Sequence, residues 1–121
     1  MRPLILIVGT ADGERLRAAL TLAAAQAALG GAVTLFLQLD AVSLLRPPIG
    51  APEDARHRAA GLPDLAALLG EAQALGVRPV ACQSGLALCG MAAADLPPGI
   101  AVGGPLSVLQ AAGDDARLLL A

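Results

Sequence analysis

The sequence alternates short, uninterrupted apolar runs with longer segments of helical periodicity, and this pattern restricts the fold more than any other feature. The first run, Leu4–Val8, has no polar residue and ends at Gly9, as is typical of a strand buried on both faces. Residues 14–29 then repeat apolar side chains on one helical face after an N-cap candidate, Asp12. The same alternation predicts strands over 33–37, 77–82, 100–102 and 117–120, and helices over 40–45, 63–75, 84–91 and 105–112.

Proline and glycine positions refine these boundaries. Pro63 is expected at the first helical position of its helix, with Gly76 just past the end. Gly90 is expected to interrupt the helix that begins at Ser84. Residues 46–62 contain three prolines and two glycines, which predicts a loop or lid.

This order of elements predicts an α/β fold. Continuous apolar strands that alternate with helices indicate a three-layer α/β/α arrangement, in which helices cover both faces of a mostly parallel five-stranded sheet. The chain has 121 residues, 56% of them hydrophobic, so we expect a single domain over 1–121 with a sizeable core.

The high apolar content also requires a test for a membrane span. Residues 18–39 carry no charge over 22 positions, which is long enough to cross a bilayer. However, seven of the first twelve are alanine, and the pair Gly30-Gly31 interrupts the stretch. Ala and Leu before the glycines give way to Val, Thr, Leu and Phe after them. A helix, a glycine turn and a strand explain this change, so no membrane span is predicted.

Charge and residue usage exclude several functions. The net charge is -2, all eight cationic side chains are Arg, and Phe36 is the single aromatic residue. The chain therefore has neither a phosphate-binding patch nor a base-stacking surface, and we expect no nucleic-acid binding. Two cysteines and one histidine are too few for a disulfide scaffold or a zinc site, and residues 9–13 match no nucleotide-binding glycine motif. We expect no metal or cofactor, and a cytoplasmic location.

Cys82 is the candidate nucleophile. Ligands of open parallel sheets bind beyond the carboxyl ends of the strands, and Cys82 lies where the third predicted strand meets a helix. Ser84 is placed to cap that helix, and the positive end of a helix favours a thiolate over a thiol. Position alone leaves a functional thiol and a small buried core residue equally supported.

Three further residues are weaker candidates. Cys89 follows two helical turns after Cys82, beyond disulfide reach in a regular helix, so we interpret it as a packed helical thiol with a helper role as the alternative. Asp40 is expected to cap the short helix after the second strand, although it could instead orient a ligand. His57 is expected to be a solvated residue of the 46–62 loop.

The order of these segments resembles the DsrE/DsrF/TusD family of small sulfur-relay proteins. The likeness begins at Leu4–Val8 and the Ala-rich helix, and continues through Val33 to Val42, where Asp40 is similar to the aspartate at the family's second strand end. Ala41 replaces the glycine that commonly follows. Residues 75–82 are similar to the family's G-V-x-[V/I]-x-x-C strand, and 100–106 to its Gly-containing entry into the last helix.

The resemblance implies a sulfurtransferase or sulfur carrier. Cys82 matches the cysteine that accepts sulfane sulfur as a persulfide and passes it to a partner thiol, without a metal or organic cofactor. It also implies sulfur donor and acceptor proteins as partners, and a homotrimer or homohexamer, or an assembly with related subunits. An apolar domain with an Ala-rich outer helix face independently favours association.

Two alternatives stay open. The chain could be a non-catalytic structural or binding subunit that keeps a cysteine at a packed position. It could also be a redox module that uses Cys82 and Cys89 as a reversible pair, although their spacing argues against this.

Overall fold

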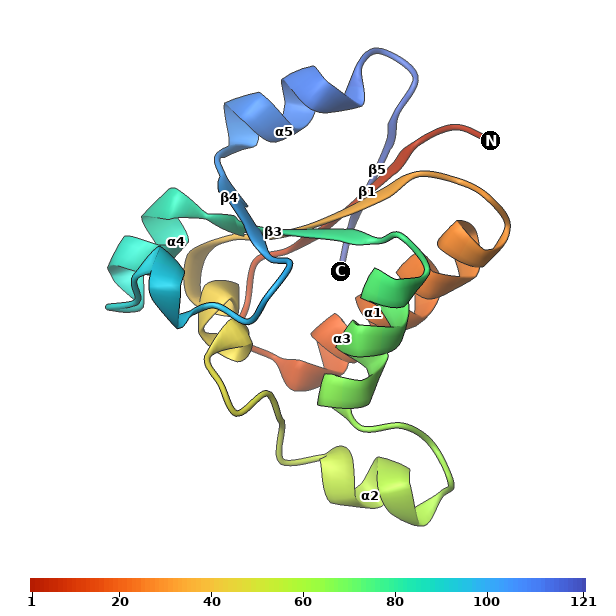
Figure 1. Cartoon of the computed structure of the whole chain (residues 1–121), viewed down its shortest axis with the longest axis vertical. Coiled ribbons are helices and arrows are strands. Elements are labelled where there is room, and N and C mark those ends of the chain that lie inside the picture. The colour runs from red at the N-terminus through yellow and green to blue at the C-terminus, as the bar shows by residue number, and fades with distance from the viewer.

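The computed structural model describes all 121 residues as a five-stranded sheet with helices on both faces (Figure 1). All strands are parallel, in the order β4-β3-β2-β1-β5. The predicted α/β class is therefore confirmed, and the strand order, which periodicity does not determine, is now defined. The strands are β1 (Leu4–Val8), β2 (Val33–Leu37), β3 (Arg78–Cys82), β4 (Ala101–Gly103) and β5 (Arg117–Leu120). The helices are α1 (Gly13–Ala28), α2 (Asp54–Ala59), α3 (Leu65–Ala74), α4 (Gln83–Leu88) and α5 (Pro105–Ala112), with short 3₁₀ helices η1 (Leu39–Leu45) and η2 (Ala93–Asp95).

The two faces of the sheet are covered unequally. Helices α1 and α3 pack side by side on one face, and α5 lies on the other (Figure 1). Twenty buried residues form the core on the α1/α3 side, whereas only five form a second cluster beneath α5. The five residues beneath α5 are Ile5, Phe36, Val80, Cys82 and Val108. The α5 face of the sheet is therefore less completely buried than the α1/α3 face.

Helix α1 forms as the sequence predicts. The Asp12 carboxylate accepts a hydrogen bond from the Glu14 backbone N–H at 2.9 Å, which satisfies a free donor in the first turn. Leu16 and Leu20 are fully buried against the sheet, and Gly30 ends the segment with φ +88°. No helix of the structure has both the length and the apolar character needed to cross a membrane.

Helix α3 begins later than predicted. It starts at Leu65, and Asp64 is its N-cap because the Asp64 carboxylate accepts the Ala67 N–H at 2.9 Å. The placement of Pro63 at the first helical position was wrong, since Pro63 precedes the cap. Its carbonyl instead accepts a hydrogen bond from Arg17 Nη1 at 2.9 Å, which joins this turn to α1.

Residues 46–62 are mostly loop, as predicted, but they include a short helix that the prediction missed. They contain α2, and Asp54 at its start joins the two ends of the segment. One carboxylate oxygen accepts the Ala51 N–H at 3.1 Å, and the other accepts the Leu65 N–H at 3.0 Å. Proline and glycine counts predict chain direction changes, but they do not reveal a buried carboxylate that organises the turns around it.

Candidate functional site

Cys82 lies at the junction of β3 and α4. It is the last residue of the strand and the N-cap residue of the helix. Its side chain belongs to the cluster beneath α5, and only 5% of the residue is exposed. In the sheet it lies opposite Gly103 of β4. The thiol is therefore placed at the carboxyl edge of a parallel sheet, as predicted, but it is largely shielded from solvent.

Ser84 does not cap α4, so the prediction for this residue was wrong. The helix begins one residue earlier, at Gln83, so Cys82 takes the cap position and no side chain accepts a capping hydrogen bond there. Ser84 lies within the first turn and is exposed. The strand continues through Cys82, which moves the start of the helix forward and leaves Ser84 inside it.

Cys89 lies at the other end of α4. It is the C-cap residue, so the helix ends before it rather than continuing to 91, and Gly90 with φ +64° turns the chain as predicted. The Cys89 side chain is half-buried, and its Sγ lies 3.8 Å from the Leu39 carbonyl oxygen. Arg46 Nη2 donates to the Cys89 carbonyl at 2.7 Å and so satisfies a free acceptor at this helix end.

Both cysteines are free thiols. They are separated by the six residues of α4, which corresponds to about 10 Å along a regular helix. This spacing is consistent with the predicted absence of a direct bridge, since a disulfide joins Cα atoms about 4.4–6.8 Å apart.

Asp40 does not act as a helix cap either. The 3₁₀ helix η1 begins at Leu39, its N-cap is Gln38, and no side chain caps it. The Asp40 side chain is exposed and makes no hydrogen bond, while its carbonyl accepts from the Ser43 hydroxyl at 2.7 Å. Leu39 has φ +54°, a left-handed conformation that is unusual for Leu, and this backbone turn shifts the helix start away from Asp40.

Gly85 allows α4 to pack directly against η1. A Cβ atom added there would lie 2.5 Å from Val42 Cγ2 and 2.9 Å from the Leu39 carbonyl oxygen, and Val42 is fully buried. The glycine is therefore required for this close approach. Because α4 has only six residues, its contact with η1 fixes the position of Cys82 at one end and Cys89 at the other.

We expect Gly85→Ala to destabilise the fold by about 1–3 kcal/mol, because the new methyl group overlaps backbone and a buried side chain. Gly70→Ala in α3 is the matched control. A Cβ there meets no atom within 4 Å, so we expect a gain of roughly 0.4–1 kcal/mol from reduced unfolded-state entropy. Urea unfolding of both variants measures the two free energies. Equal effects of the two substitutions would contradict the close-packing argument.

His57 is bound rather than solvated, so the expectation for this residue was wrong. Its Nε2 lies 3.0 Å from Glu14 Oε2, and the His57 side chain is 17% exposed. Arg56 Nη2 also contacts Glu14, at 3.2 Å. The hydrogen bond from His57, followed by that from Arg17, lowers the pKa of Glu14 below its ordinary value. The interaction joins α2 to the start of α1, so residues 46–62 are held in place.

A buried ion pair lies beneath this contact. Arg17 of α1 and Asp54 of α2 are 7% and 6% exposed, and Arg17 Nη2 donates to Asp54 Oδ1. Burial raises the pKa of Asp54, but the hydrogen bonds from Arg17 and from two backbone N–H groups outweigh it, so the pKa falls below its ordinary value. The same pairing raises the pKa of Arg17 despite desolvation. The sequence analysis did not predict this cluster. The signal it contained was the i,i+3 spacing of Glu14 and Arg17, with Arg17 on the face of α1 whose other residues are buried.

Comparison with known proteins decides the family. A family model described as the DsrE/DsrF-like family matches residues 2–120, which is nearly the whole chain. The chain belongs to the DsrE/DsrF-like family. The resemblance drawn from the sequence is thus confirmed.

Solved structures share the fold of this DsrE/DsrF-like chain. The ychN protein from E. coli has a TM-score of 0.78 and 21% identity, with full coverage of both chains. MTH1491 from Methanobacterium thermoautotrophicum gives 0.75 at 16% identity, again over all of both chains. BT1422 from Bacteroides thetaiotaomicron gives 0.69 at 16%, covering 98% of this chain and 94% of its own. At these identities the likeness establishes the fold. No curated protein matches the sequence.

The segments behind the DsrE/DsrF-like resemblance form one continuous part of the sheet. They become β1, β2 with η1, β3, and β4 with the start of α5. Strands β1 to β4 are consecutive neighbours in the strand order, so the carboxyl ends of these strands share one edge. Cys82 lies at that edge, and none of the other candidate residues, Ser84, Asp40 and Cys89, forms a hydrogen bond to its thiol.

Proposed function

We propose that this DsrE/DsrF-like protein is a sulfur carrier that accepts sulfane sulfur on Cys82 as a persulfide. The supporting observation is the position of Cys82, at the carboxyl end of β3 in a chain whose whole length matches a family implicated in sulfur relay. No other thiol lies at a strand end, since Cys89 follows α4. Both thiols are free, as a carrier in the reducing cytoplasm requires.

The proposed chemistry is two successive thiol exchanges. The Cys82 thiolate attacks the outer sulfur of a donor persulfide, R–S–SH. Its electron pair forms the new S–S bond, the donor S–S bond breaks, and the donor leaves as R–S⁻. An acceptor thiolate then attacks the outer sulfur of Cys82–S–SH, and Cys82 leaves as the thiolate. The sulfane sulfur keeps its oxidation state, so no external oxidant or reductant is needed.

Access to Cys82 requires local movement. With 5% exposure, the thiol cannot meet a donor sulfur unless the elements that cover it move briefly. Its side chain packs beneath α5 in the same cluster as Val108, whereas α4 is held against η1. We therefore expect α5 to shift away from the sheet as the sulfur is delivered.

Assembly into a homotrimer or homohexamer, with or without related subunits, is part of the proposal. Edge strand β5 exposes Leu118, Leu119 and Leu120, and an apolar groove runs between β5 and Leu22 of α1. A contiguous apolar surface on an open sheet edge favours burial against another chain. The donor and acceptor proteins would then approach the carboxyl edge of each subunit.

A non-catalytic subunit is the second candidate, and the burial of Cys82 supports it. Alkylation separates the two proposals. In Cys89→Ser, which isolates Cys82, we expect iodoacetamide to label Cys82 slowly but well before the protein unfolds, because local opening exposes the thiol. In Cys82→Ser we expect faster labelling of half-buried Cys89. Labelling of Cys82 only in denaturant would favour the non-catalytic subunit.

A Cys82/Cys89 redox module is the weaker alternative. The thiols lie at opposite ends of α4, so a bridge would require the helix to unwind. A dithiol that stays reduced under mild oxidant would exclude this function.

A further inference from the structure

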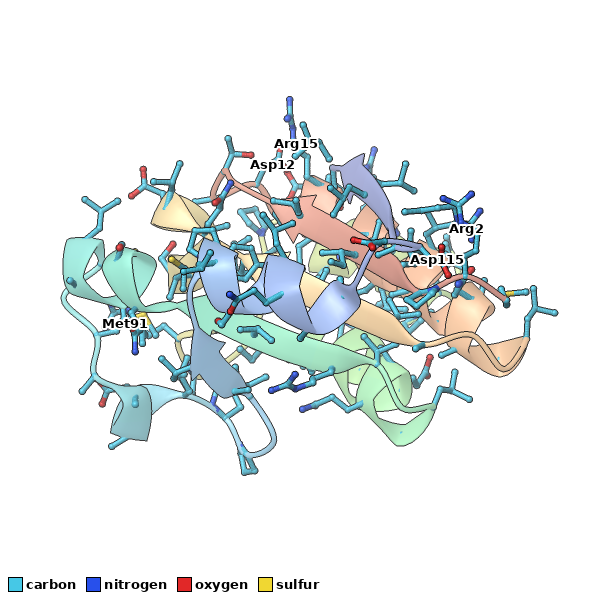
Figure 2. All side chains as sticks on the ribbon, turned by 90° about the horizontal axis from the view of Figure 1, so that it is seen from above. Arg2, Asp12, Arg15, Met91 and Asp115 are labelled. Atoms are coloured by element: carbon cyan, nitrogen blue, oxygen red, sulfur yellow. The ribbon has the colours of Figure 1, made fainter.

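A cavity lies on the α5 face, and two of its lining residues, Val80 and Val108, also belong to the cluster that contains Cys82. It has a volume of about 200 Å³ and is enclosed by β2, β3, β4 and α5. Figure 2 shows this face of the sheet: α5 lies over the sheet, and β3 and β4 extend beyond the part that α5 covers. The lining includes Thr34, Arg78, Val80, Ser107, Val108 and Ala111. No acidic side chain is among the lining residues, so the charge in the cavity comes from Arg78 alone.

Arg78 differs from every other arginine of the chain. The other seven each make at least one hydrogen bond or ion pair, whereas Arg78 makes none. Arg78 begins β3 and is exposed at the cavity. A guanidinium with five donors and no acceptor in the protein is available for an external anion. The seven paired residues are Arg2, Arg15, Arg17, Arg46, Arg56, Arg58 and Arg117.

Thr34 supplies a second free donor beside Arg78. The two residues are register partners on adjacent strands β2 and β3, so their side chains stand next to each other on the same face of the sheet. Thr34 is partly exposed and lines the same cavity, and its hydroxyl takes part in none of the side-chain hydrogen bonds of the structure. Two neighbouring donors without acceptors are suited to the two oxygens of one carboxylate.

The remaining wall is mostly apolar, and its one further polar side chain, Ser107, has its hydroxyl hydrogen-bonded to the Gly104 backbone. Val80 of β3 and Val108 of α5 are buried and line the cavity together with Ala111. Gly103 maintains the space between them, since a Cβ there would lie 3.1 Å from Ser107 Oγ and 3.3 Å from Val80 Cγ1. A polar end with donors and an apolar body is the usual composition of a small-molecule site.

We propose that this cavity binds a small monocarboxylate with a short aliphatic body. The carboxylate would accept hydrogen bonds from Arg78 and Thr34, and the aliphatic part would pack against Val80, Val108 and Ala111. The cavity holds about six or seven water volumes, which suits a chain of roughly six carbons. An inorganic anion would leave the apolar wall uncovered, and a cation would meet Arg78. This proposal does not depend on persulfide chemistry at Cys82.

The probe is hexanoate, and its binding is monitored by ¹⁵N NMR titration of the full chain. We expect saturable shifts of the Thr34, Val80 and Val108 amide signals at millimolar concentrations. Hexanol and hexylammonium, which match its length, should bind at least about tenfold more weakly because they lack the carboxylate. Comparable binding of hexanol would overturn the proposal, as would the absence of shifts at these residues. Sulfate causing the same shifts with equal affinity would also overturn it, because the apolar wall would then contribute nothing.

Variants locate the site. Arg78→Gln keeps most of the side-chain length at an exposed position and should weaken hexanoate binding at least about tenfold. Arg15→Gln, at an exposed arginine of α1, is the matched control and should bind as the original chain does. Thr34→Val, which removes only the hydroxyl, should weaken binding to a smaller extent. Equal binding by Arg78→Gln and Arg15→Gln would overturn the proposal.

A carboxylate on a second copy of the chain is the other source of this chemistry. Sedimentation of Arg78→Gln distinguishes the sources. We expect its oligomeric state to equal that of Arg15→Gln. A smaller oligomer for Arg78→Gln, without hexanoate shifts in the original chain, would overturn the small-molecule proposal and assign the cavity to a subunit contact.

Discussion

Cys82→Ser is expected to abolish sulfur loading. After incubation with polysulfide, intact-mass spectrometry of the original chain should show the addition of one sulfur atom that a reducing agent removes. The Ser hydroxyl is not ionised at neutral pH and does not form a persulfide, so the variant should show no addition at this site. The residue is small and buried, and the change replaces one atom, so the fold should be kept.

Cys89→Ser is the matched control, since both variants retain one thiol. It should load nearly as well as the original chain, because Cys89 lies at the far end of α4. Full loading of Cys82→Ser would assign the sulfur to half-buried Cys89 and overturn the role of Cys82. If neither the original chain nor the variants take up sulfur from polysulfide or thiosulfate, the non-catalytic subunit is favoured. If Arg78→Gln also fails to take up sulfur, the α5-face cavity would be assigned to binding of the sulfur donor.

The sheet could be predicted from the sequence because burial on both faces leaves a direct trace. Leu4–Val8 is a continuous apolar run, Val33–Leu37 is apolar except for Thr34, and both strands match the predicted bounds. β3 was also found, although it contains Pro79, which lacks a backbone donor. Its pairing with β4 begins only at Val80, so on that side Pro79 has no partner strand. Strand order left no such trace, since it depends on packing between distant segments.

The caps around the site were harder to predict. Ser84 and Asp40 both have side chains typical of caps, yet neither is one. The cap position depends on the residue at which the preceding strand ends. This residue is set by the sheet register and by the left-handed turn at Leu39. A shift of one residue is within the usual uncertainty of a boundary, but it exchanges the cap residue entirely.

The 46–62 segment shows a second limit of sequence patterns. Its Pro and Gly content predicted a loop or lid, but it did not predict that Arg17 and Asp54 join the segment to α1 from 37 residues away in the chain. Local periodicity carries no information about a contact at that separation. The only local trace was a charged residue on the buried face of α1, opposite a segment rich in charge.

Asp54→Asn is expected to destabilise the fold by about 3 kcal/mol near neutral pH, because it leaves the buried Arg17 guanidinium without its main counter-charge. Asn retains one acceptor oxygen, but it cannot serve Arg17 and the Ala51 and Leu65 N–H groups together as the carboxylate does. Asp64→Asn is the matched control. Asp64 is a partly exposed N-cap with an ion pair to exposed Arg58, and Asn caps as well as Asp, so we expect a loss below about 1 kcal/mol.

The pH dependence of this difference tests its electrostatic origin. The pKa of Asp54 lies below its ordinary value of 3.8 in the folded protein, so the unfolded chain takes up a proton first as the pH falls. The contribution of the ion pair is therefore fully present above the ordinary value and is lost as the pH falls through the folded value. Asp54→Asn lacks this contribution, so its deficit in urea unfolding should be constant from about pH 7 to 5 and shrink below about pH 4. A deficit that persists unchanged in acid would show that Asp54 acts through shape and hydrogen bonding, and that its charge contributes little to holding α2 against α1.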